Sequence, residues 1–495
     1  MTTVTKEQGS KAEGSSAFDA YQTSLTTRYC SPAMSKLFSQ RSRHSTWRRL
    51  WYHLAECEKE LGINTITPEA IEQMKAHLVV TDDEFEIARI EEKIRRHHVH
   101  AFGVVAPAAA GIIHLGATSC FVTDNTELIL MRDALDLIAK KLAKVISNLS
   151  SFAVKWKAEP TLAYTHLQAA QLITVGKRAA QWAQDLMLDL HTIEQVRSEL
   201  KFRGAQGTTG TQASFLEIFQ GDSAKCDELN VLLCKRFDFP GCYDVSTQTY
   251  TRKVDLIIAN AVAGLGATAQ KITGDLRHLA TWKEIEEPHE SSQIGSSAMA
   301  YKVNPMRSER VYSLARELMS KPASFANTLS DQWMERTLDD SAIRRIDIPE
   351  MFLLADAILL GLDNISSGLV VYPNRIAFRV QEELPFMITE TIIMRMVAQG
   401  ASRQETHEQI RVISNQAGSV VKNEGKPNDL VSRIQNNEFF KPIWGDIHGM
   451  LKADLYIGRS AEIVDKYCGP GGVVEKALAP YAAYIKGSSS AELSV

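Results

Sequence analysis

The sequence predicts an all-α protein organised around a bundle of long helices. From Leu128 to Phe152 the apolar residues recur at alternating steps of three and four, a heptad seam typical of a long helix packed beside others. Signals for strands are scarce in the same region. The 495 residues are 44% hydrophobic and 23% charged, which is the balance of a globular protein with a sizeable core.

Four more apolar stripes follow this seam, and each predicts a helix. They span residues 172–200, 254–279, 306–319 and 343–365. The seam itself is expected to begin near Asp124, with Glu127 three residues later as a capping partner. The stripe at 254–279 is rich in Ala and Gly, so we expect that helix in the middle of the bundle. Five long helices carry more apolar surface than a small bundle needs, which favours an oligomer over a single-chain bundle.

Changes in composition divide the chain into four parts. We expect a disordered polar tail over residues 1–20, an N-terminal helical domain over 21–118, the central bundle over 119–371 and a C-terminal helical domain over 372–495. No stretch reaches the roughly 18 apolar residues of a membrane span. The tail also lacks the apolar run of a secretory signal.

Charge and cysteine content narrow the classes of function. Lys and Arg number 55 and Asp and Glu number 59, giving a net charge of −4, which disfavours a general nucleic-acid binder. The seven cysteines form no C-x-x-C pair, so reduced thiols and a cytoplasmic location are expected. His97, His98 and His100 come without carboxylate or cysteine ligands at metal-site spacing, so no metal site is expected.

Three short loops between the predicted helices are small, polar and dense in functional side chains. They are residues 116–119, 204–214 and 291–305. Glycine and serine let backbone N–H groups converge on an anion, although each loop alone is equally compatible with a plain connection. The third loop contains Gly-Ser-Ser-Ala-Met at 295–299, followed by Lys302, Asn304 and Pro305. Such a long signature has few chance matches.

This signature resembles that of the fumarase/aspartase superfamily, whose members eliminate fumarate from a succinyl group. Other segments resemble the eukaryotic adenylosuccinate lyases in particular: residues 27–29, 111–120, 248–253, 306–310 and 335–341. The resemblance covers nearly the whole chain from about Ser24. It implies a three-domain, all-α lyase. It also implies a homotetramer whose active sites combine residues of more than one subunit, and no metal or organic cofactor.

The resemblance also implies roles for individual residues. It makes Ser296 the base that removes a proton next to a carboxylate, and His166 the acid that protonates the leaving nitrogen. The succinyl group is assigned to Thr118, Ser119, Gln248, Lys302 and Asn304. The phosphate is assigned to Arg28, Tyr29, Arg336, Ser341 and Arg345, and the substrate-binding set is completed by Arg96, His97 and Arg310. The three arginines assigned to the phosphate, Arg28, Arg336 and Arg345, suit that group because each guanidinium can donate two parallel hydrogen bonds.

The implied reactions are the release of fumarate from adenylosuccinate, which gives AMP, and from SAICAR, which gives AICAR, in purine nucleotide synthesis. Two alternatives stay open: a paralogue that cleaves another N-succinyl compound, and a catalytically silent paralogue that keeps only the scaffold. Two departures from the family pattern motivate the first alternative. Compared with that pattern, four residues are missing between His97 and His98. In addition, Thr247 replaces a glycine. A glycine often marks a backbone conformation that a β-branched residue resists. The intact base, lysine and acid argue against the silent alternative.

Overall fold

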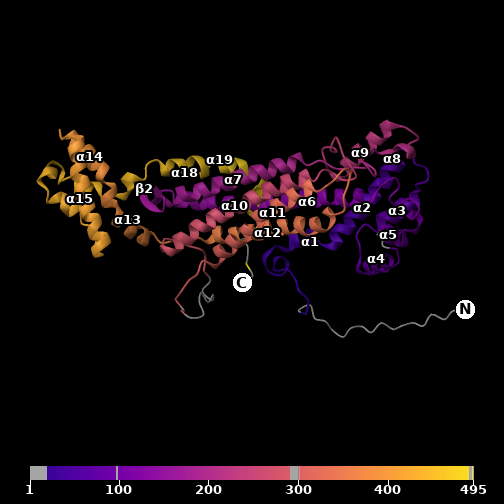
Figure 1. Cartoon of the computed structure of the whole chain (residues 1–495), viewed down its shortest axis with the longest axis horizontal. Helices are drawn as coiled ribbons and strands as arrows, with labels where there is room; N and C mark the ends of the chain where they lie inside the picture. The colour runs from indigo at the N-terminus through magenta and orange to yellow at the C-terminus, as the bar shows by residue number, and fades with distance from the viewer. Residues whose placement is uncertain (1–18, 96–98, 290–298, 300, 490–492, 494–495) are drawn as a thin grey trace.

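Helices dominate the computed structural model, which describes residues 19–95, 99–289, 299, 301–489 and 493. The molecule is elongated, with a bundle of long helices in its middle and groups of shorter helices at both ends (Figure 1). The all-α prediction is confirmed. Among the described residues, no helix combines the length and apolarity that crossing a membrane requires.

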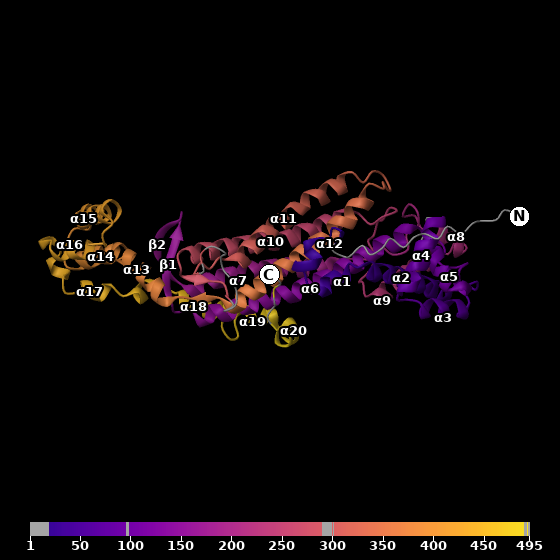
Figure 2. The ribbon, with the colours of Figure 1, turned by 90° about the horizontal axis from the view of Figure 1, so that it is seen from below.

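The central bundle contains five long helices that pack along one another (Figures 1 and 2). They are α6 (Ser119–Lys155), α7 (Val175–Glu199), α10 (Lys253–Thr281), α11 (Met306–Ser330) and α12 (Asp340–Gly368). At 1.5 Å per residue, α6 is about 55 Å long. The Ala- and Gly-rich helix α10 packs against α7, α11 and α12, as its small residues predict.

The boundaries of three bundle helices differ from the sequence-based expectations. Helix α6 begins at Ser119 after the N-cap Thr118, so the predicted cap at Asp124 is wrong. The Asp124 carboxylate instead accepts a long-range hydrogen bond from Arg252. Helix α7 begins at Val175 and not at residue 172, which lies in a strand. Helix α11 runs on to residue 330, although it contains Pro322, because residues beyond the proline, such as Phe325, are buried against the bundle.

Most of the N-terminal helices cover one end of the bundle. The N-terminal elements are η2 (Leu25–Tyr29), α1 (Pro32–Leu37), α2 (Gln40–Glu60), α3 (Pro68–Ala76), α4 (Asp82–Arg95), α5 (Val99–Val105) and η3 (Pro107–Ala109). Of these, η2 and α1 lie alongside the bundle helices and not at the end. Helices α8 (Ala213–Ile218) and α9 (Ser223–Phe237) join the remaining N-terminal helices from the connection between α7 and α10. Serine and threonine side chains cap α1, α2 and α3, which explains why these helices begin where they do.

The other end is formed by residues that follow α12. These elements are α13 (Pro373–Met387), α14 (Thr389–Ala398), α15 (Arg403–Glu424), α16 (Leu430–Gln435), η4 (Glu438–Ile443), α17 (Ile447–Met450) and η5 (Ala453–Tyr456). The chain then returns along α6 and α7 through α18 (Ser460–Cys468), α19 (Val473–Leu478), η6 (Ala479–Tyr481) and α20 (Ala482–Gly487) (Figure 2).

Two small antiparallel sheets interrupt the helical architecture. Strand β1 (Pro160–Thr165) pairs with β2 (Gln168–Thr174), and β3 (Ile285–Glu286) pairs with β4 (Val370–Val371). The first pair forms a hairpin whose turn consists of His166 and Leu167 alone. The hairpin lies towards the α13 end of the bundle, far from α2 (Figure 1).

Glu58 of α2 gives a testable link between pH and stability. Its side chain is fully buried, and neither carboxylate oxygen has a hydrogen-bond partner among the described residues. Burial raises the pKa of Glu58 to about 9 from its ordinary value of 4.5. The folded chain therefore holds a proton here that the unfolded chain has released between these two values, and stability falls as pH rises across that window.

We expect Glu58→Gln to raise the melting temperature more at pH 8 than at pH 5, because the glutamine has no ionised form that the fold must exclude. Differential scanning calorimetry at both pH values measures the two gains. Equal gains would contradict the assignment, since they would show that Glu58 does not titrate between the folded and unfolded states.

Candidate active site

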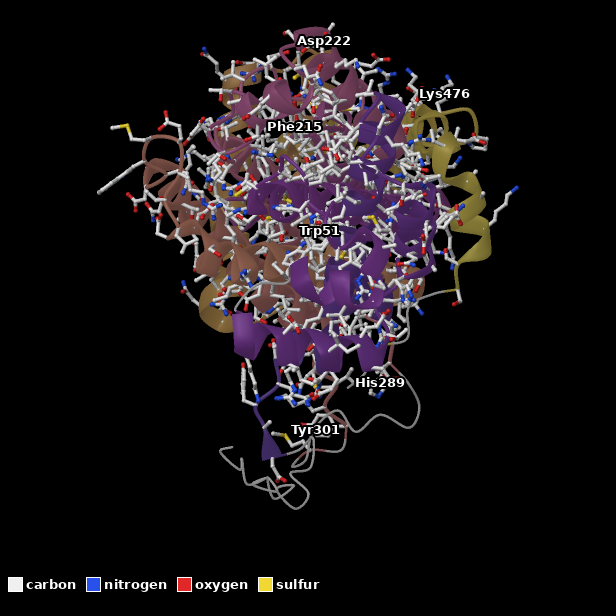
Figure 3. The ribbon with its side chains drawn as sticks, turned by 90° about the vertical axis from the view of Figure 1, so that its right-hand side faces the viewer. Trp51, Phe215, Asp222, His289, Tyr301 and Lys476 are labelled. Atoms are coloured by element: carbon white, nitrogen blue, oxygen red, sulfur yellow. The ribbon has the colours of Figure 1, made fainter. Side chains whose placement is uncertain are left out.

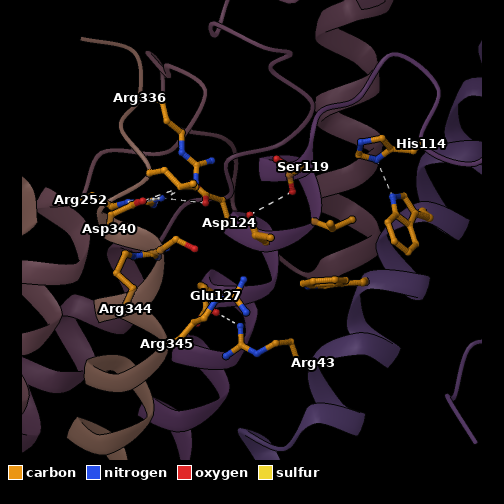
Figure 4. A pocket seen from close by; sticks show the side chains of 16 residues that line it. Arg43, His114, Ser119, Asp124, Glu127, Arg252, Arg336, Asp340, Arg344 and Arg345 are labelled. Atoms are coloured by element: carbon orange, nitrogen blue, oxygen red, sulfur yellow. Dashed lines mark hydrogen bonds and ion pairs between the residues drawn. The ribbon is translucent and has the colours of Figure 1, made fainter. Parts of the chain in front are cut away.

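A pocket of about 240 Å³ lies where the N-termini of α6 and α12 meet α2 (Figure 4). It brings together four residues that the sequence predicted for substrate binding: Ser119, Arg336, Ser341 and Arg345. Additional residues with polar or aromatic side chains line it: Arg43, Trp47, Trp51, His114, Thr123, Asp124, Glu127, Arg252, Asp340 and Arg344. The concentration of guanidinium groups suits an anionic ligand.

Two further predicted residues lie beside this pocket. Gln248 accepts a hydrogen bond of 3.2 Å from Arg336 Nη1, and its own side-chain amide donates to the Thr208 carbonyl at 3.1 Å. Thr118 is the N-cap residue of α6 and directly precedes Ser119. The 116–119 loop, the 204–214 loop and the segment around Arg336 therefore meet at one place, as a single binding site requires.

Thr247 does not disturb this meeting of loops. It is absent from the residues with positive φ, and its backbone N–H and side-chain hydroxyl both donate to the Thr249 carbonyl, at 3.1 and 3.2 Å. The steric constraint falls on Gly210 instead. Gly210 has φ +82°, and an added Cβ atom would lie 1.9 Å from the Ser246 carbonyl oxygen. A threonine at 247 is therefore compatible with the geometry of the site.

Buried ion pairs form the floor of the pocket. Arg252 donates to Asp340 at 2.8 Å and to the two carboxylate oxygens of Asp124 at 3.0 and 3.2 Å. Next to it, Arg344 donates to Asp255 at 2.8 Å. Burial opposes ionisation of Asp124, but Arg252 and Arg344 outweigh it and lower the pKa of this carboxyl. The floor is thus a rigid, charged platform that orients the residues above it.

His114 is a pocket residue that the sequence analysis missed. Its Nδ1 atom accepts a hydrogen bond of 2.8 Å from the Trp51 indole N–H, which leaves the proton of the neutral ring on Nε2. His114 has φ +69°, and such left-handed conformations of non-glycine residues concentrate at functional sites. The signal that would have found it is its position inside the 111–120 segment, four residues before Thr118.

Arg28, Tyr29 and Arg310 lie in a second pocket, of about 650 Å³, together with Lys141 and Lys144. The Arg310 guanidinium lies over the Tyr29 ring at 5.2 Å from its centroid. The two lysines lie on α6, and Lys141 is about 33 Å along that helix from Ser119 at 1.5 Å per residue. Within one chain, the residues predicted for the phosphate are therefore divided between two pockets.

His166 occupies a third location, at the exposed tip of the β1–β2 hairpin. His166 and Leu167 have φ of +53° and +58°, as both central residues of a type I′ turn must. That turn favours Asn-Gly, because each residue with a Cβ in this conformation costs about 1–2 kcal/mol. The hairpin follows the C-terminal end of α6, whereas the first pocket lies at its N-terminal end. His166 and Arg336 of one chain thus belong to opposite ends of the bundle.

The segment that contains the predicted base connects β3 to α11. Ser296 lies outside the described residues, as do Arg96, His97 and His98. The two ends of the segment are joined by Glu287, whose buried carboxylate accepts hydrogen bonds from the backbone N–H groups of Arg307 and Ser308 at 2.9 and 2.8 Å.

Several described residues of this segment are exposed. The side chains of His289 and Tyr301 project beyond the body of the bundle (Figure 3), and Tyr301 is 85% exposed. Lys302 is exposed and Asn304 is half-buried just before α11. In one chain, neither residue lines the pocket that contains Ser119. The predicted site residues described here therefore fall into separate groups.

Comparisons with known proteins decide the family. A family model described as "Lyase" matches residues 27–320, and one described as "Adenylosuccinate lyase C-terminus" matches residues 385–467. The adenylosuccinate lyase of Saccharomyces cerevisiae is 53% identical over 472 residues, which cover 94% of this chain and 98% of that protein. The chain belongs to the adenylosuccinate lyase family. The adenylosuccinate lyase of Schizosaccharomyces pombe is 52% identical, and the match again covers 94% of this chain and 98% of that protein.

Solved structures of proteins with lower sequence identity to this chain show the same fold. The 3-carboxy-cis,cis-muconate lactonizing enzyme of Pseudomonas putida has a TM-score of 0.76 and 20% identity, covering 93% of this chain and 99% of its own. A fumarate lyase from Mesorhizobium has a TM-score of 0.75 and 22% identity, covering 91% and 99%. The family prediction is confirmed, and the chain is a lyase that acts on a small molecule.

Proposed function

We propose that the chain releases fumarate from adenylosuccinate to give AMP, and from SAICAR to give AICAR. One observation carries this proposal: Ser119, Arg336, Ser341 and Arg345 converge on one pocket above a buried ionic floor. Arginine side chains at this density suit a phosphorylated, dicarboxylate substrate. The identity to adenylosuccinate lyases over almost the full chain supports the same choice of substrate.

The proposed reaction is an elimination by a base and an acid. Ser296 takes a proton from the carbon next to a carboxylate, the bond to the leaving nitrogen breaks, and His166 donates a proton to that nitrogen. The negative charge that develops on the succinyl carboxylates needs donors already in place. Thr118, Ser119 and Gln248 supply neutral donors, and Lys302 supplies positive charge.

We further propose that the active enzyme is a homotetramer whose sites combine residues of different subunits. The separation of the predicted site residues supports this, because a substrate cannot span about 33 Å of α6, let alone its whole length. The loop that carries Arg336 also exposes Trp333, Met334 and Leu338 by 67, 90 and 73%. Large apolar side chains that are exposed close together in this way are typical of a surface that a partner covers.

In this assembly, Arg28 and Tyr29 of one subunit join Arg336, Ser341 and Arg345 of another around the phosphate. His166 and the segment of Ser296 reach the same site from further subunits. The strained His-Leu turn supports such a role for His166, since it leaves this histidine exposed at the tip of the hairpin. We also propose a cytoplasmic location, supported by seven cysteines that are all free thiols.

Mixing two inactive variants tests the shared site. We expect His166→Ala and Arg336→Ala to be nearly inactive alone. Random reassembly should restore roughly a quarter of the wild-type sites, because each complete site then draws an intact histidine and an intact arginine from different chains. Fumarate release after mild dissociation and reassociation of an equimolar mixture measures the recovery.

Two controls complete this experiment. Each variant dissociated and reassociated alone should stay inactive. A chain that carries both substitutions, mixed with either single variant, should also release no fumarate. If the mixture remains inactive although a tag on one variant captures both variants in the same oligomers, both residues act within one chain and the shared-site proposal is wrong. An inactive wild-type protein would favour the silent paralogue.

A further inference from the structure

The β1–β2 hairpin is held near its turn by an aromatic stack. Tyr164 pairs with Ala169 in the ladder, two residues before His166. Its ring stacks on the ring of Trp282, with 4.4 Å between centroids and 27° between planes. Trp282 is the C-cap residue of α10. The stack therefore connects the strand that leads into the turn with the end of a long bundle helix.

Arg379 of α13 completes this contact from a third segment. Its Nη2 atom donates to the Tyr164 hydroxyl at 2.8 Å, and its guanidinium lies over the Trp282 ring, 4.7 Å from the centroid. Its Nη1 atom lies 3.0 Å from Glu284 Oε1. The side chains of Glu284 and Arg379 are only 1 and 16% exposed. We call Tyr164, Trp282, Glu284 and Arg379 the hairpin clamp.

Electrostatic and stacking contacts orient the Arg379 side chain in the clamp. Burial raises the pKa of Glu284, and the nearby Arg379 and Arg178 oppose that rise. The Arg379 guanidinium is planar, so pairing one nitrogen with Glu284 and stacking on Trp282 leaves its second nitrogen pointing at the Tyr164 hydroxyl. The orientation of the tyrosine is thus set by groups that lie outside the hairpin.

The remainder of the hairpin has other anchors. Arg178 of α7 donates to the Leu162 carbonyl at 2.6 Å, and Thr174, at the end of β2, caps α7 by accepting from the Lys177 N–H. Losing the Tyr164 hydroxyl should therefore leave the hairpin folded. It should change the direction of the strained two-residue tip, because Tyr164 lies in the last ladder pair but one before the turn.

We propose that Arg379 and Tyr164 are positioning residues that aim His166 at the substrate of another subunit. This inference rests on the proposed function of His166 as the general acid. The clamp acts through His166 and does not touch the substrate itself. A misplacement of about 1 Å in an acid–base group can cost up to 10²-fold in rate, so a small loosening of the turn suffices for a measurable effect.

Tyr164→Phe is the first test, because phenylalanine keeps the stack on Trp282 and removes only the hydroxyl. We expect kcat to fall about tenfold while KM changes less than about twofold, since substrate binding does not involve the clamp. Arg379→Lys, which keeps the charge but loses the planar fork, should behave similarly. Tyr372→Phe is the matched control: it removes a tyrosine hydroxyl that donates to Glu286 nearby at 2.9 Å, and it should leave kcat unchanged.

A double-mutant cycle separates positioning from general damage. In a His166→Ala background, Tyr164→Phe should cause no further loss of kcat, because the group that it positions is gone. An equal loss in both backgrounds, or an unchanged kcat in Tyr164→Phe alone, would overturn the inference. If His166→Ala itself retained near-normal activity, the proposed role of His166 would fail instead, so the two failures are distinguishable.

Discussion

Replacing His166 with alanine should lower kcat by about 10²–10⁴-fold, the usual contribution of a positioned general acid. Without the imidazole, the leaving nitrogen must depart without a proton, which raises the barrier to breaking its bond to carbon. KM should change little, because the side chains proposed to bind the anionic parts of the substrate, Ser119, Arg336 and Arg345, are intact in this variant. Initial rates of fumarate formation over a range of adenylosuccinate concentrations measure both quantities.

His191→Ala is the matched control for this experiment. His191 is an exposed histidine on α7, outside the residues that line the pockets described above, and its loss should leave kcat unchanged. Circular dichroism and size-exclusion chromatography should show that both variants keep the fold and oligomeric state. A His166→Ala enzyme with near-wild-type kcat would remove the acid role from this residue.

Replacing Arg252 with methionine should lower the free energy of unfolding by about 3–5 kcal/mol, the usual loss when one partner of a buried ion pair is removed. Methionine fills much of the volume but leaves two carboxylates, Asp124 and Asp340, each only 1% exposed, without the cation that lies nearest to both. Equilibrium unfolding in urea at a fixed protein concentration measures the change. We also expect weaker substrate binding, because these carboxylates no longer hold the floor of the pocket.

Arg411→Met provides the comparison on the surface. Arg411 also makes an ion pair, with Glu408 at 2.7 Å, but both side chains are more than half exposed. Water screens such a pair, so no measurable change in stability is expected. If Arg252→Met lost less than about 1 kcal/mol, the value typical of exposed pairs, the ionic floor would not be the stabilising element described above.

Local patterns in the sequence predicted the long helices well, for a physical reason. The apolar residues of α6 and of the other four long helices recur every three or four positions. This periodicity is visible within each segment alone, so it predicts a helix without any knowledge of distant contacts. The predictions failed where a distant partner decides. Asp124 has the residue type and spacing of a cap, but it bonds to Arg252, 128 positions away. The short strands β3 and β4 likewise form only because α10 and α12 bring them together.

The sequence by itself determined the fold class, the family and the residue types available for chemistry, because helical periodicity and signature segments are local properties of the chain. Only the tertiary structure decided which of those residues meet. Ser119, Gln248, Arg336 and Arg345 converge because the ends of rigid helices bring their loops together. Arg28 and His166 lie elsewhere because α6 is one continuous helix about 55 Å long. Residues beside its middle and beyond its far end therefore cannot reach the pocket of their own chain.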